Sequence, residues 1–163
     1  MADHDELWRT WLEAHLWIER PDGLGWWHIS PRPEGVVGDW PLVAPVYLLT
    51  AYNPRGEELP LEENEERLAE LATYLRTELI AAVRSLGASE DGSWMEPGFA
   101  LLDVGEAQAL AIARRFEQAA IYAWSAAGLE VVGALDGGRV SVGWSLDEEQ
   151  PPNLERVSGT PLS

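Results

Sequence analysis

Two groups of polar residues in this chain have types and spacings that could support chemistry. The first contains Thr50 and Asn53, which end an apolar run, and Asn64, which opens a helical pattern further along. Ligands tend to bind where a strand ends and the next helix begins. We therefore expect these three residues to bind a ligand, although the neighbouring glutamates oppose an anionic one. A simpler role stays open, because Asn-Pro often starts a turn and Asn64 could serve only as a helix cap.

The second group surrounds a glutamate that precedes an apolar, strand-like run. Glu96 and Gln118 each stand just before such a run, and Trp94 and Phe116 stand close to them in the sequence. A carboxyl group enclosed by aromatic rings can have a raised pKa and act as an acid or base. Glu96 is therefore the predicted catalytic residue, with Trp94 and Gln118 as predicted ligand contacts. The alternative is that Glu96 and Gln118 only bond to nearby backbone or arginine groups.

The composition excludes several kinds of site. The chain has no cysteine, so disulfides, thiolate metal sites and cysteine nucleophiles are ruled out. All 11 basic residues are arginine, which removes Schiff-base and phosphate-loop lysines. The histidines His4, His15 and His28 lack a metal-binding spacing, and no serine has an evident histidine partner. We therefore expect no metal and no cofactor.

The net charge and the N-terminal sequence indicate the cellular compartment of the protein. The formal net charge is −17 in 163 residues, which repels nucleic acids and anionic membranes. No apolar run approaches the roughly 20 residues of a membrane helix, and the N-terminus does not resemble a secretion signal. We therefore expect a cytoplasmic protein that binds neither nucleic acid nor membrane. A composition rich in Ala, Gly, Arg and Trp and free of lysine is typical of GC-rich bacterial genomes.

Hydrophobic periodicity predicts one α+β domain. Helices are expected over residues 5–19, 62–85 and 105–118, strands over 26–30, 43–52, 99–104 and 119–125, and a hairpin over 129–144. This β-α-β-α-β-β order favours a ferredoxin-like or related two-layer sandwich with its helices on one face, plus an N-terminal helix. The predicted domain covers residues 1–146, with a Trp-rich extension at 1–42, a core at 43–146 and a flexible acidic tail at 147–163.

That topology separates the two polar groups. If the strands are parallel, a right-handed crossover places the end of one strand and the start of the next at opposite edges of the sheet. Asn53 and Asn64 would then lie far from Glu96 and Gln118. A single pocket containing all four would require a different strand order or direction.

Four motifs in order resemble a known family. The segments are "LLTAYNP", "ENEERLAEL", "WMEPGFALLDV" and "RRFEQAAIYAW". Together they resemble a bacterial family of uncharacterised proteins, domain of unknown function 3293, with its T-A-x-N-P, E-x-x-F and F-x-Q-x-A-I pattern over about residues 43–126. One departure is Gly98, where the family pattern leads us to expect a small hydroxyl residue. The resemblance implies a shared domain and no particular reaction.

Three functions remain open at this level. We favour a non-catalytic module that binds a protein partner or a small polar ligand, because nucleophiles and metal spacings are missing and tryptophan is abundant. Trp26 and Trp27 are adjacent and should point to opposite faces, so one of them could form a homodimer contact. The alternatives are a small hydrolase or transferase that uses Glu96 on a polar or nucleotide-like metabolite, and an acidic inhibitor of a basic partner.

Overall fold

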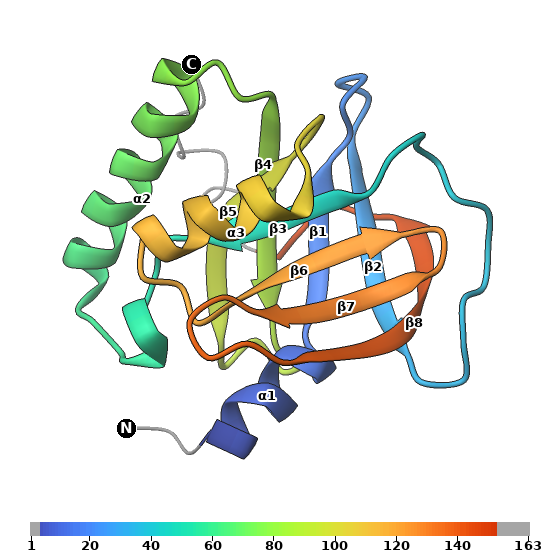
Figure 1. Cartoon of the computed structure of the whole chain (residues 1–163). Coiled ribbons are helices and arrows are strands. Elements are labelled where there is room, and N and C mark those ends of the chain that lie inside the picture. The colour runs from blue at the N-terminus through green and yellow to red at the C-terminus, as the bar shows by residue number, and fades with distance from the viewer. Residues whose placement is uncertain (1–3, 153–163) are drawn as a thin grey trace.

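The computed structural model describes residues 4–152, which form a closed antiparallel β-barrel (Figure 1). Its strands are β1 (His15–Glu19), β2 (Trp26–Arg32), β3 (Val46–Thr50), β4 (Ala82–Ala88), β5 (Met95–Leu101), β6 (Ala120–Ser125), β7 (Gly128–Gly133) and β8 (Arg139–Glu148). The helices are α1 (His4–Glu13), α2 (Leu61–Thr77) and α3 (Glu106–Arg115), with a short 3-10 turn η1 (Pro54–Gly56). The strand order around the barrel is β1-β2-β8-β7-β6-β3-β5-β4, and β4 pairs with β1 to close it.

The predicted two-layer sandwich is therefore wrong. Two segments expected to be single long helices each contain a helix followed by a strand. The segment predicted as a helix at 5–19 ends its helix at Glu13 and continues as β1. In the segment 62–85, α2 ends at Thr77, Leu79 adopts a left-handed φ of 57°, and β4 follows. A left-handed residue cannot continue an α-helix, and the two additional strands close the sheet on itself.

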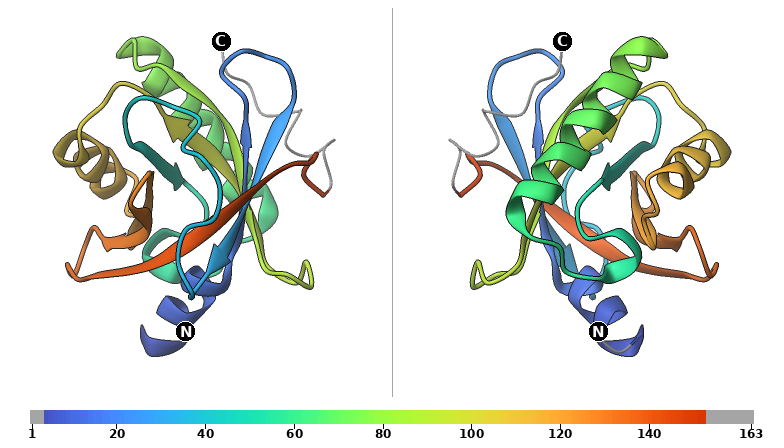
Figure 2. Two further views of the ribbon diagram at one scale, coloured as in Figure 1. Left: turned by 90° about the vertical axis from the view of Figure 1, so that its right-hand side faces the viewer. Right: turned by 90° about the vertical axis from the view of Figure 1, so that its left-hand side faces the viewer.

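Alternation along the strands separates an inner core from an outer one. On β3 and β5, Leu48 and Ala100 face the barrel interior, while Leu49 and Phe99 pack against the helices. The outer core lies between α2, α3 and the strands β3, β5 and β6. Figure 2 shows these two helices outside the barrel wall, and α1 lies separately below the barrel in Figure 1.

Tryptophan side chains fill one end of the barrel interior. Trp124 is fully buried, and its ring contacts Trp40, Trp144 and Trp27 at centroid distances of 4.6, 5.6 and 6.1 Å. The indole N–H of Trp144 donates to the carbonyl oxygen of Ser125 at 2.8 Å. Such edge-on aromatic packing gives this end a dense apolar core.

The parts of the chain outside the predicted core also belong to the barrel. The Trp-rich stretch supplies β1 and β2, and Trp26 and Trp27 do point to opposite sides of β2. Both residues are 8% exposed. A homodimer stays a prediction. The predicted hairpin is present as β7 and β8, and β8 runs to Glu148, into the predicted tail. The rest of that tail, residues 153–163, lies outside the described residues. Within residues 4–152, no helix combines the length and apolar character needed to cross a membrane.

Candidate functional site

A cavity of about 720 Å³ occupies the barrel end that faces α1. Its walls come from inward-facing residues of β1, β3, β4, β5, β6 and β7, and α1 contributes Leu7, Thr10 and Trp11. The exposed glutamates Glu6, Glu57 and Glu58 also line it and mark its mouth. An eight-stranded barrel is just wide enough to be filled by side chains or to hold one small ligand. Here the tryptophans fill one end, and the other end is hollow.

Small side chains create this hollow end. Ser85, Gly87, Gly98 and Ala120 stand at lining positions where larger side chains would fill the space. At Gly98 an added Cβ would overlap the backbone carbonyl oxygen of Leu49, so the pairing of β3 with β5 needs glycine there. This explains why the hydroxyl residue expected from the family pattern does not fit this barrel.

Glu96 supplies the carboxyl group inside the cavity wall. Its carboxyl oxygen Oε1 accepts a hydrogen bond from Nδ2 of Asn53 at 2.9 Å, and Trp94 is a second donor. Burial raises the pKa of Glu96 from its ordinary 4.5 to about 7, and the two hydrogen bonds partly offset that rise because they favour the charged form. The side chain is half-buried, since it lines the cavity. It can therefore exchange a proton near neutral pH.

Asn64 fixes the position of Asn53 through two hydrogen bonds. The Asn53 backbone N–H donates to Oδ1 of Asn64 at 2.8 Å, and Nδ2 of Asn64 returns a bond to Oδ1 of Asn53 at 2.8 Å. Oδ1 of Asn53 also accepts the N–H of Leu59 at 3.1 Å. Asn53 has a left-handed φ of 48°, which asparagine tolerates better than most residues. Asn64 is 4% exposed and does not line the cavity, so it positions Asn53 rather than meeting a ligand.

Thr50 and Gln118 line the cavity and secure its rim. The Thr50 hydroxyl donates to the carbonyl oxygen of Pro97 at 2.6 Å and accepts the N–H of Tyr52 at 3.1 Å. Nε2 of Gln118 donates to the carbonyl oxygen of Tyr52 at 3.1 Å. Both side chains therefore fix the turn after β3.

The two polar groups meet because the strands are antiparallel. Thr50 at the end of β3 pairs with Gly98 of β5, two residues after Glu96, and Leu48 pairs with Tyr122 near the start of β6. The end of β3 therefore adjoins the starts of both neighbours, and the expectation of opposite sheet edges was wrong. Thr50, Asn53, Trp94, Glu96 and Gln118 all line one cavity. Their roles in binding stay predictions.

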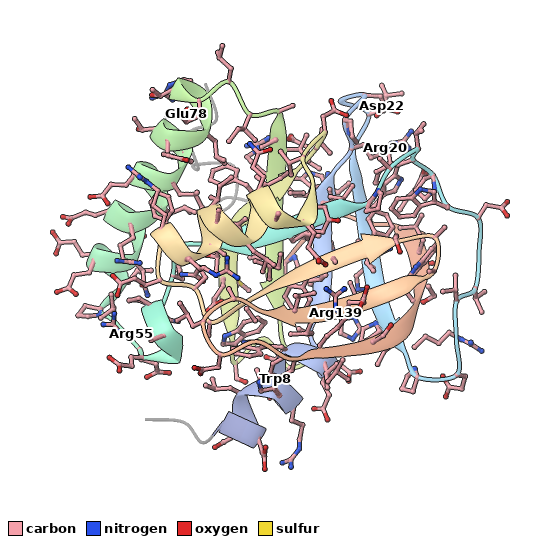
Figure 3. The ribbon with its side chains drawn as sticks, viewed as in Figure 1. Trp8, Arg20, Asp22, Arg55, Glu78 and Arg139 are labelled. Carbon is pink, nitrogen blue, oxygen red and sulfur yellow. The ribbon has the colours of Figure 1, made fainter. Side chains whose placement is uncertain are left out.

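Sequence reasoning missed Tyr122 and the contribution of α1. Tyr122 faces the cavity from β6, and its hydroxyl donates to the carbonyl oxygen of Trp11 at 2.9 Å, which ties α1 to the barrel. Trp8 of α1 packs beside Gly138 in the β7–β8 turn (Figure 3). The alternation of Ala120, Tyr122 and Trp124 along one strand was the available signal for an inward-facing tyrosine.

The charged side chains that line the cavity are all acidic. Its described lining includes the carboxyl groups of Glu6, Glu57, Glu58 and Glu96, and no arginine or histidine. Nearby Arg55 pairs with Glu117, outside the lining. No cluster of three or more His, Asp or Glu side chains within residues 4–152 is arranged to hold a metal ion.

Fold and cavity together define a small closed barrel with an internal chamber. Residues 49–121 match the sequence model of a family described as "Protein of unknown function (DUF3293)". The match confirms the resemblance to this family that the four motifs predicted. It runs from the end of β3 to the start of β6 and includes Thr50, Asn53, Asn64, Trp94, Glu96 and Gln118. Comparisons with curated proteins and with solved structures find no match.

Proposed function

We propose that this protein is a non-catalytic binding module that holds one small molecule inside the barrel. The supporting observation is the cavity of about 720 Å³, which falls within the range of roughly 300–1,000 Å³ for small-molecule sites. Its wall combines aromatic side chains, namely Trp11, Tyr52, Trp94 and Tyr122, with one inward carboxyl group. An apolar chamber with a few polar anchors is the usual composition of such sites.

Two hydroxyl groups in the cavity lining favour binding over catalysis. The hydroxyls of Thr50 and Tyr122 donate to backbone carbonyl oxygens, so neither is paired with a base that would activate it. Glu96 is the observation that favours a second candidate, a small enzyme. Its pKa of about 7 suits proton transfer near neutral pH.

The binding proposal is tested by an NMR screen of neutral, cationic and anionic aromatic fragments. We expect at least one fragment to shift amide resonances of β4, β5 and β6 around the cavity. The variant Ala120→Phe fills the cavity and should abolish these shifts. Ala126→Phe adds the same ring at an exposed position of the β6–β7 turn and serves as the matched control.

Two results would contradict the proposal. One is that no fragment perturbs the residues around the cavity. The other is that Ala120→Phe, folded as judged by its own spectrum, binds the same fragments as the wild type. Turnover of a bound compound that is lost in Glu96→Gln would instead support the enzymatic candidate.

A further inference from the structure

We propose that the ligand of this cavity is an organic cation, with one protonated amine or amidine group attached to an apolar body. This inference rests on the proposed binding function and adds the chemical class of the ligand. It follows from the charges around the cavity, from the free acceptor capacity of Glu96 and from the aromatic wall.

Charge complementarity is the first argument. Glu6, Glu57 and Glu58 mark the mouth and Glu96 lies within, while the described lining contains no arginine or histidine. Arg67 is not part of this lining, and its guanidinium group donates to the backbone carbonyl oxygens of Ala51 and Phe116. A cleft lined by one sign of charge concentrates ligands of the opposite sign.

The carboxyl group of Glu96 supplies the second argument. A carboxylate offers about four acceptor sites on its two oxygens. Asn53 and Trp94 are its two donors, so acceptor sites remain for a ligand. Neither donor carries a charge. An ammonium or amidinium group that enters the chamber would therefore form the only ion pair of this carboxylate among the described residues.

The aromatic lining supplies the third argument. Trp11, Tyr52, Trp94 and Tyr122 line the chamber that contains Glu96. Aromatic faces attract cations, and this attraction strengthens when the cation loses its water. The same rings provide apolar surface for the rest of the ligand. An anionic ligand would face four carboxyl groups without a compensating cation, which disfavours it strongly.

The experiment compares three probes with one carbon skeleton, namely phenylbutylamine, phenylbutanol and phenylbutyrate. Affinities are measured by NMR titration of the full chain at about pH 8, where Glu96 is ionised. We expect the amine to bind at least about tenfold more tightly than the alcohol, and phenylbutyrate to bind weakest. Glu96→Gln should remove most of the preference for the amine over the alcohol. Glu78→Gln removes an exposed charge far from α1 (Figure 3) and should change neither affinity.

A pH series provides a second readout. The affinity for the amine should rise by about tenfold between pH 6 and pH 8, because Glu96 loses its proton there and the amine keeps its own. The other titratable groups lining the chamber are Glu6, Glu57, Glu58 and two tyrosines. Burial raises the pKa of Tyr122 well above its ordinary value, so that group stays neutral throughout the series. In Glu96→Gln the rise should disappear.

The outcomes separate this inference from the binding function on which it rests. If the alcohol binds in the cavity and the amine binds no more tightly, the cation is ruled out and the binding module stands. If the preference for the amine persists in Glu96→Gln, the ion pair with Glu96 is ruled out and the binding module again stands. If none of the three probes binds and the fragment screen is also negative, both proposals fail together.

Discussion

Replacing Glu96 by glutamine should stabilise the protein at high pH. Glutamine has nearly the same shape, and its Oε1 can still accept the hydrogen bond from Nδ2 of Asn53. The substitution removes the buried negative charge and replaces one carboxyl oxygen with an amide NH2 group. Burial of that charge is the main reason why the pKa of Glu96 rises from 4.5 to about 7. A carboxyl group with a raised pKa disfavours folding wherever it must ionise in the folded protein.

The magnitude and its pH window follow from the two pKa values. Below about pH 4.5 the group is protonated in both the folded and the unfolded chain, so it costs nothing. Between pH 4.5 and 7 the folded protein retains a proton that the unfolded chain releases, so the stability falls as the pH rises. Each pKa unit corresponds to about 1.4 kcal/mol, which gives a full cost of about 3 kcal/mol above pH 7. Partial exposure to the cavity reduces this to about 2 kcal/mol.

The measurement is urea unfolding of the wild type and Glu96→Gln at about pH 5 and about pH 8. The free energy of unfolding of the variant should exceed that of the wild type by about 2 kcal/mol at the higher pH and by less than about 1 kcal/mol at the lower. Glu78→Gln controls for the loss of one negative charge in an acidic protein. A variant that is less stable than the wild type at both pH values would show that Glu96 is a structural residue, and the reasoning would be refuted.

Three further substitutions test the framework around the cavity. Asn64→Ala should cost about 2–3 kcal/mol in urea unfolding, because it leaves buried hydrogen-bonding groups unpaired, whereas the exposed neighbour Glu65→Ala should stay within about 0.5 kcal/mol. Tyr122→Phe should lower the free energy of unfolding by about 1 kcal/mol and speed amide hydrogen exchange in α1 but not in α3; equal rates in α1 would contradict the tether. Gly98→Ser should cost at least about 2 kcal/mol, and Gly105→Ser, where an added Cβ meets nothing within 4 Å, should cost less than about 1 kcal/mol.

Local sequence signals indicate the polar residues of the candidate site, whereas the fold depends on distant strand pairings. Asn53 before a proline and Glu96 before a strand are readable from residue type and position. That they share a chamber was not readable, since it depends on strand direction. Direction is set by the pairing of β3 with β5 and β6, which are distant in the sequence. The three strands gather the polar groups only because each pair is antiparallel.

The barrel was not predicted from the sequence because two short strands were assigned to helices. In "HLWIE", Leu16 and Ile18 alternate with outward-facing residues, but the preceding helix has a compatible apolar stripe, so the strand was read as a continuation of the helix. In the second segment the helix ends at a left-handed leucine, Leu79, which carries no glycine or proline signal. Burial in a closed sheet outweighs local helix propensity at both places.

The barrel interior has a filled end and a hollow end, and the hollow end lowers stability in a way that suggests a function. One end is filled by Trp124 and its aromatic neighbours, and the same strand presents Ala120 to the hollow end. Larger apolar residues at lining positions such as Ala120, and glutamine in place of Glu96, would raise stability. A chain that instead retains a chamber and a costly carboxyl group carries features that stability alone does not explain. Such a trade-off is typical of a binding or reaction site. Glu96 therefore combines a substantial cost to folding with a position in the cavity lining.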